Sequence, residues 1–217
     1  DVLVYDTDPK VLSRCVQHIA TNLGAIAAHG LINKSAIDQI ISRVHPATSL
    51  SDAVTGTQLV IEAIPEDVNL KRRLFQDLDK LCDPSVILAT NTSVISVSDI
   101  SSMAHARHRI VGTHFWNPPY LIPLVEVVAG ERTAEASIDR AIQIYADLGM
   151  RPLRVRKEVP GFLSDRLQEA LWREALHLVN DGVATPEELD VAISFGPGLR
   201  WALWGTCLIF HLAGGQG

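Results

Sequence analysis

Apolar and polar positions follow two alternating patterns over the first 159 residues of the chain. Short apolar runs of the length expected for strands occur at positions 1–6, 57–64, 86–90, 110–114, 124–128 and 152–155. Apolar residues spaced three or four apart, which indicate helices with one packed face, occur at 11–28, 67–82 and 134–148, with a more polar helical stretch at 33–44. This alternation predicts an α/β fold with a doubly wound, mostly parallel sheet.

The pattern changes after Pro160. One long helix is expected over 161–180, and Thr185-Pro186-Glu187-Glu188 has the sequence of a capping box that starts another helix. No strand is apparent beyond this point. We therefore expect two domains, an α/β domain over residues 1–159 and an all-helical domain over residues 160–217.

Composition and charge narrow the class of protein. The 217 residues are 47% hydrophobic and 20% charged, which is ordinary for a soluble globular protein. The net charge of -6 and the absence of a basic run argue against nucleic acid as a partner. No apolar stretch reaches the roughly 18 residues of a membrane-spanning helix, and no signal peptide opens the sequence, so we expect no membrane association.

The cysteines and histidines give no support for a metal site. Cys15, Cys82 and Cys207 are odd in number and widely spaced, and no zinc-binding spacing occurs among the cysteines and eight histidines. Three unpaired thiols are typical of a reducing compartment, which predicts a cytoplasmic protein without a metal cofactor.

Three motifs place polar side chains at or near the ends of predicted strands. ILATNTS (87–93) carries an Asn and a Ser, GTHFWNPP (112–119) a His, and LVEVV (124–128) a Glu. Ligand sites of open α/β sheets lie at the carboxyl ends of strands, so these side chains can converge there. Glu126 stands in an apolar strand, and an unpaired buried carboxylate would be costly, which favours a paired role for it.

The order N-T-S, H-F-x-N-P, L-V-E-V and P-G-F resembles the 3-hydroxyacyl-CoA dehydrogenase superfamily over nearly the whole chain. The resemblance implies a Rossmann-type NAD-binding domain followed by a helical domain. It also implies that His114 is a general base, that Glu126 orients it, and that Ser93 and Asn117 contact the reacting hydroxyl. An imidazole can take an alcohol proton near neutral pH, and a carboxylate on its other nitrogen fixes the tautomer. A simpler role stays open for Ser93, which could only cap a turn.

The same resemblance assigns candidate cofactor contacts. Glu66 and Lys71 match family positions near the nicotinamide and its ribose, and Asn91 matches a further cofactor contact, although Lys71 could instead belong to the exposed face of a helix. Asp6 ends the first predicted strand of this chain and fits the acid that ends the second strand of a Rossmann domain and binds the adenosine ribose, which favours NAD over NADP.

A glycine-rich phosphate loop is missing from this picture. None of the 14 glycines forms G-x-G-x-x-G, and the stretch that starts at Gly196-Pro197-Gly198 has Trp201 in place of the last glycine. We therefore expect the sequence to be incomplete at both ends of its two-domain fold. We also expect these residues alone to hold NAD weakly, since backbone N–H groups of that loop bind the pyrophosphate.

The second half of the sequence narrows the substrate. Asp165 replaces the Asn usual in acyl-CoA enzymes, and a carboxylate there suits a cationic substrate. Segments 169–175 and 196–205 resemble the branch of the family that oxidises L-carnitine, a 3-hydroxy acid with a quaternary ammonium. Arg200 could pair with the carboxylate of such a substrate. Aromatic faces attract such cations, and the candidates are Trp116, Tyr120, Trp201 and Trp204.

Alternative functions remain within and outside this family. One is the branch that contains L-gulonate 3-dehydrogenase and lambda-crystallin, and another is a 3-hydroxybutyryl-CoA dehydrogenase. A non-catalytic, crystallin-like protein is an alternative of a different class. Trp201 and Trp204 lie three residues apart, so they could instead pack in a core or in a dimer interface. Pairing through the helical domain is implied by the resemblance, which predicts a homodimer.

Overall fold

The computed structural model describes residues 1–215 and divides into two compact units, Asp1–Phe162 and Leu163–Gly217. The last two residues of the expected helical domain, Gln216 and Gly217, lie outside the described residues.

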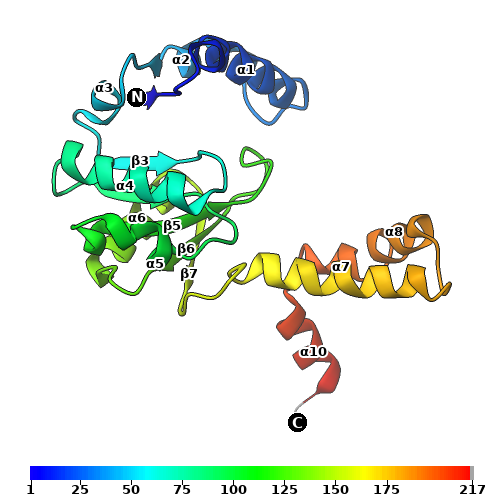
Figure 1. Ribbon diagram of the computed structural model, residues 1–217. Helices are drawn as coiled ribbons and strands as arrows, with labels where there is room; N and C mark the ends of the chain where they lie inside the picture. Colours follow the sequence, from blue (N-terminus) through cyan, green and yellow to red (C-terminus); the bar gives the residue numbers. More distant parts are fainter. Residues whose placement is uncertain (216–217) are drawn as a thin grey trace. The chain divides into compact units, whose positions relative to one another are not determined.

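The larger sheet among the described residues has five strands in the order β3-β4-β5-β6-β7 (Figure 1). The strands are β3 (Leu59–Glu62), β4 (Ile87–Thr90), β5 (Ile110–Phe115), β6 (Leu124–Ala129) and β7 (Arg151–Val155). All neighbouring strands in it run parallel except β5 and β6, which are antiparallel. The predicted α/β fold with a mostly parallel sheet is confirmed.

Both faces of this sheet are covered, which explains why its strands are almost continuously apolar. On one face, α4 (Val68–Leu81) and α5 (Val97–Ile100) pack with Leu88, Ile110 and Val128. On the other face, α6 (Glu135–Asp147) packs with strand residues of the alternate set, Ile87, Ala89, Val111, Val125 and Val127. Successive strand residues point to opposite faces, so each strand contributes to both cores.

The first fifty residues form a smaller parallel pair of strands with helices. β1 (Val2–Val4) pairs with β2 (Val44–Pro46) in a separate sheet. Helix α1 (Pro9–Ala28) begins as predicted, because the Asp8 side chain accepts the Lys10 N–H and proline occupies the first turn.

The helix predicted over 33–44 is only partly correct. The structure has η1 (Lys34–Ala36) and α2 (Ile37–Ile41) there, and the segment then turns into β2, which no sequence pattern indicated. A strand of three residues that ends in proline is too short to show a period, and its pairing with β1 is a long-range contact. A further short helix, α3 (Leu50–Val54), follows a Ser49 cap that the sequence reading also passed over.

The second unit is helical, as predicted. Its helices within the described residues are α7 (Ser164–Asn180), α8 (Pro186–Ser194), α9 (Pro197–Trp201) and α10 (Thr206–Gly214). The capping box at Thr185 and Glu188 is present in full. Helix α7 starts three residues later than predicted because Gly161 and Phe162 have φ angles of 72° and 46°, which a right-handed helix excludes.

Arg109 is a buried cation that joins helix α4 to the start of β5. Its guanidinium donates to the backbone oxygens of Asp79 and Asp83 and lies 3.1 Å from an Asp79 carboxylate oxygen. The two side chains are only 4% and 6% exposed. The Asp79 carboxylate also accepts the N–H groups of His105 and Ala106. Burial by itself would raise the pKa of Asp79, but these hydrogen bonds and the Arg109 charge outweigh it and lower that pKa.

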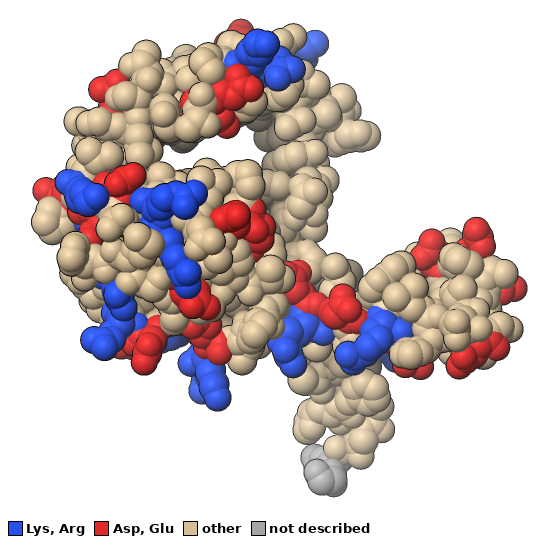
Figure 2. All heavy atoms as spheres, viewed as in Figure 1, with Lys and Arg blue, Asp and Glu red and all other residues tan. Residues whose placement is uncertain are grey.

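The surface mixes charges of both signs. Figure 2 shows Lys and Arg side chains interspersed with Asp and Glu over the face in view. Within residues 1–215, no helix is long and apolar enough to span a membrane. The same residues contain no group of three or more His, Cys, Asp or Glu side chains placed to hold a metal ion.

Candidate functional site

His114 and Glu126 form a buried hydrogen-bonded pair across β5 and β6. The two residues are register partners, and His114 Nδ1 lies 2.8 Å from Glu126 Oε2. The histidine is 5% exposed and the glutamate is fully buried. A carboxylate can only accept, so Nδ1 carries the hydrogen, and proton exchange with an alcohol would use Nε2.

The antiparallel pairing corrects one expectation from the sequence. We expected both residues to meet at the carboxyl ends of their strands, and His114 does lie near the end of β5. Glu126 instead is the third residue of β6, nearer that strand's amino end. The two side chains meet because β6 runs in the opposite direction to β5.

Two aromatic rings contact the imidazole of His114. The ring centroids of Trp116 and Phe162 lie 5.9 and 5.8 Å from that of His114, and both rings are tilted against it. Phe162 is 1% exposed and holds a left-handed backbone conformation, which is costly for a residue with a side chain. Sequence reasoning used P-G-F only as a family motif and gave Phe162 no role. A signal that could have found it is Gly161 directly before it. A glycine often marks a turn with positive φ, and a large apolar residue in such a turn indicates a buried side chain there.

The turn that follows β4 approaches the end of β5. The Asn91 side-chain oxygen accepts the Phe115 N–H at 3.0 Å, one residue beyond His114. Ser93 is half-buried in the same turn, and its N–H is bonded to Glu66. The structure therefore brings Asn91 near the His114 strand end and joins Ser93 to Glu66.

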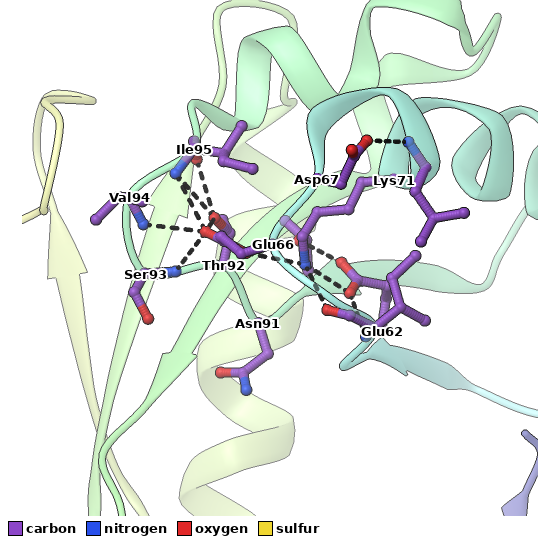
Figure 3. Close-up of polar contacts among 12 residues, drawn as sticks. Glu62, Glu66, Asp67, Lys71, Asn91, Thr92, Ser93, Val94 and Ile95 are labelled. Carbon is purple, nitrogen blue, oxygen red and sulfur yellow. Dashed lines mark hydrogen bonds and ion pairs between the residues drawn. The ribbon is translucent and has the colours of Figure 1, made fainter.

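Figure 3 shows a network of charges at the ends of β3 and β4. Lys71 lies 2.7 Å from Glu62 and 3.2 Å from Glu66, and Thr90 donates to Glu62 at 2.6 Å. Sequence reasoning named Glu66 and Lys71 but missed Glu62. The signal that could have found Glu62 is a carboxylate closing an otherwise apolar strand, the same argument that singled out Glu126.

The other predicted residues of the first unit lie outside these contacts. Asp6 follows β1 in the smaller sheet, where one carboxylate oxygen accepts the Asp8 N–H at 2.8 Å. Asn117 is exposed just after β5, and Tyr120 is 49% exposed.

The predicted residues of the second unit lie on two helices and in the turn after the second of them. Asp165 belongs to the first turn of α7. Arg200 and Trp201 end α9, and the Trp204 N–H donates to the Arg200 carbonyl at 2.8 Å. The two tryptophans are 37% and 50% exposed.

Comparison with known families gives a match to each part of the chain. Residues 1–159 match the NAD binding domain of 3-hydroxyacyl-CoA dehydrogenase, and residues 161–217 match the C-terminal domain of the same enzyme family. The chain belongs to the 3-hydroxyacyl-CoA dehydrogenase family. Its first unit therefore corresponds to the NAD binding domain of this family.

Curated relatives resemble the chain at 40% identity or more. The L-carnitine dehydrogenase of Pseudomonas syringae pv. syringae is 45% identical over 217 residues, covering 100% of this chain and 67% of that protein. The L-carnitine dehydrogenase of Burkholderia mallei is 50% identical over 175 residues, covering 81% of this chain and 54% of that protein. The chain thus spans about two thirds of the length of such relatives, or less.

Solved structures share the fold. A 5-formyl-3-hydroxy-2-methylpyridine 4-carboxylic acid 5-dehydrogenase, an NAD+ dependent dismutase, superposes with a TM-score of 0.88 at 33% identity, covering 98% of this chain and 68% of that one. The 3-hydroxybutyryl-CoA dehydrogenase of Escherichia coli has a TM-score of 0.81 at 32% identity, covering 88% of this chain and 40% of that one. Dehydrogenases of different substrates therefore share this framework, so the substrate must be argued from individual residues.

Proposed function

We propose that the protein oxidises the 3-hydroxyl group of L-carnitine to the ketone of 3-dehydrocarnitine, with NAD as the hydride acceptor. The observation that carries the proposal is the buried His114–Glu126 pair, with 2.8 Å between the imidazole and the carboxylate. The similarity to L-carnitine dehydrogenases, at 45% identity over 217 residues for one of them, supports this choice of substrate.

The proposed proton acceptor is His114. Its Nε2 takes the hydroxyl proton, and the imidazolium that forms is stabilised by the Glu126 carboxylate at Nδ1. Ser93 and Asn117 are proposed to hold the substrate oxygen while this proton leaves. NAD, when bound, would supply the acceptor for the hydride that leaves carbon 3 of the substrate.

Residues of the first unit fit a dinucleotide. The Asp6 carboxylate has one oxygen bonded to the Asp8 N–H, which leaves the other for ribose hydroxyls and suits NAD. Asn91 and Glu66 are proposed to lie near the nicotinamide end, because Asn91 bonds the backbone directly after His114. We propose residues 1–159 as the NAD-binding domain on this basis.

Residues 160–217 are proposed to supply substrate recognition. Asp165 would attract the quaternary ammonium group, and Arg200 would pair with the substrate carboxylate. The aromatic side chains proposed to contact the trimethylammonium group are Trp116, Tyr120, Trp201 and Trp204. The partial exposure of Trp201 and Trp204 supports their availability to a ligand.

NADH formation with L-carnitine tests the proposed function. We expect activity with L-carnitine and NAD, and much less with L-gulonate, with 3-hydroxybutyryl-CoA or with NADP. The NAD concentration should be varied widely, because these residues carry no G-x-G-x-x-G loop. Asp165→Asn should raise the carnitine KM by about 10- to 100-fold, the loss expected for one charge-assisted contact. Preference for gulonate, or an unchanged carnitine KM in Asp165→Asn, would contradict the assignment of substrate.

We also propose a homodimer formed through the helical unit. That unit exposes many large apolar side chains, among them Leu167, Leu171, Trp172, Leu176, Phe195, Leu203, Phe210 and Leu212. Exposed apolar surface of this extent is typical of association sites. Sedimentation should give twice the mass of the 23.7 kDa chain, and a monomer at micromolar concentration would contradict this proposal.

A reducing, cytoplasmic location is proposed from the cysteines. Cys15, Cys82 and Cys207 are all unpaired, and Cys207 is exposed. An exposed free thiol is typical of proteins that work in a reducing compartment.

A further inference from the structure

Lys71 has its ammonium inside the protein and not at the surface. It lies in the first turn of α4, and its side chain is 1% exposed. Nζ lies 2.7 Å from Glu62 Oε1, 3.2 Å from Glu66 Oε2 and 3.3 Å from the Ile64 carbonyl oxygen. An ammonium has three N–H donors, so these acceptors use all of them.

Glu62 connects the ends of two neighbouring strands. It is the last residue of β3, opposite Thr90 at the end of β4, and its side chain is fully buried. One carboxylate oxygen accepts the Ile64 N–H at 2.7 Å and the Lys71 ammonium. The other accepts the Thr90 hydroxyl at 2.6 Å. Each oxygen of this buried charge therefore has a partner, as a buried carboxylate requires.

The Glu66 carboxylate accepts several backbone N–H groups of the turn after β4 (Figure 3). Its Oε1 accepts the N–H groups of Ser93, Val94 and Ile95 at 3.2 to 3.4 Å, together with the Thr92 hydroxyl. Burial alone would raise the pKa of Glu66, but the hydrogen bonds from Thr92 and Val94 and the Lys71 charge outweigh it and lower that pKa. Glu66 is therefore ionised at neutral pH and holds the turn from one side.

We propose that Glu62, Lys71 and Glu66 form a positioning unit that sets the conformation of the turn 91–95, a role for Lys71 beyond the place near the nicotinamide ribose that the family resemblance implies for it. Glu62 fixes the Lys71 ammonium, Lys71 fixes Glu66, and Glu66 fixes the turn. The proposal rests on the proposed function, since the turn matters to catalysis through Asn91 and Ser93.

Acetylation of lysines in the native protein tests where the Lys71 ammonium lies. Lys80, on the same helix, has a side chain that is 61% exposed and serves as the internal control. We expect acetic anhydride to modify Lys71 at least about tenfold more slowly than Lys80, because the buried ammonium must first be released by local opening. Equal rates at the two lysines would overturn the proposal.

Amide hydrogen exchange, followed by mass spectrometry, tests the link to the turn. In Lys71→Met and Glu66→Gln, the amides of residues 93–95 should exchange about tenfold faster or more, while α6 keeps its wild-type rate. The matched control Lys80→Met should leave both segments unchanged. If Lys71→Met does not fold, Glu66→Gln still tests the proposal. The Glu66 side chain is 37% exposed, so its replacement should leave the protein folded. Wild-type exchange of the turn in Glu66→Gln, or equal acceleration throughout the sheet, would overturn the proposal.

Steady-state kinetics separates positioning from a merely structural role. Glu66→Gln should raise the KM for NAD about tenfold with little change in melting temperature, and Lys80→Met should not. Lysine acetylation and amide hydrogen exchange can both be measured in a protein that does not turn over substrate. A protein that shows the expected labelling and exchange but oxidises no carnitine would refute the proposed function and leave the positioning unit standing.

Discussion

Replacement of His114 by glutamine is expected to lower kcat for carnitine oxidation by about 100- to 10,000-fold, the usual contribution of a positioned general base. Glutamine fills a similar volume but cannot take the hydroxyl proton. The KM for NAD should change little, because the substitution removes no proposed dinucleotide contact. Initial rates of NADH formation at saturating carnitine measure the effect.

Two further variants make this test specific. His108→Gln, at an exposed histidine of the short helix η3 (Arg107–Arg109), should keep wild-type turnover. Glu126→Gln should lower kcat by about 100-fold or more, because a neutral amide neither fixes the Nδ1 tautomer nor stabilises the imidazolium. Near-normal turnover in His114→Gln would refute the proposed role of His114 as proton acceptor.

Replacement of Arg109 by methionine is expected to lower the free energy of unfolding by about 3 to 5 kcal/mol, the loss typical of breaking a buried ion pair. The substitution leaves the Asp79 carboxylate buried without its cation, at a site where both side chains are less than 10% exposed. It also removes the donors to the backbone oxygens of Asp79 and Asp83. Urea unfolding at neutral pH measures the difference.

The pH dependence of unfolding provides a check on the same pair. Because the folded-state pKa of Asp79 lies below its ordinary value of 3.8, its contribution to stability is present above that value. The contribution is lost as the pH falls through the lowered pKa. Asp79→Asn should therefore lose less stability than wild type between pH 5 and the acid limit.

A control variant and a double-mutant cycle complete the stability experiment. Arg72→Met, which breaks the more exposed pair with Asp99, should cost no more than about 1 kcal/mol. The double variant Arg109→Met with Asp79→Asn should be less destabilised than the sum of the single variants, since the two side chains interact directly. Strict additivity would show that the pair does not contribute as proposed.

Much of the candidate site could be predicted from the sequence, because its polar residues lie in or directly after apolar strands. A carboxylate in an apolar strand must be paired when buried, which favoured a paired role for Glu126, and the family resemblance implied that its partner is His114. The structure gives Glu126 the predicted partner, His114, at 2.8 Å. The same argument, applied to Glu62, would have found the buried network that the sequence reading passed over.

The sequence by itself determined the α/β order, the helical second part and the membership of the family. These depend on apolar periodicity and on motifs, both of which are local properties of the chain. Helix α1 illustrates this, since Asp8 and Pro9 fix its start without reference to any distant residue.

Only the tertiary structure decided which strands pair and in which direction. The β2 strand exists because β1 lies beside it, and His114 faces Glu126 because β6 runs antiparallel to β5. The contacts of Lys71 were decided in the same way, since periodicity along a helix indicates which face is polar but not which acceptors surround an ammonium. Strand pairing and buried charge networks join residues distant in sequence, and the pattern of one segment does not specify its partner.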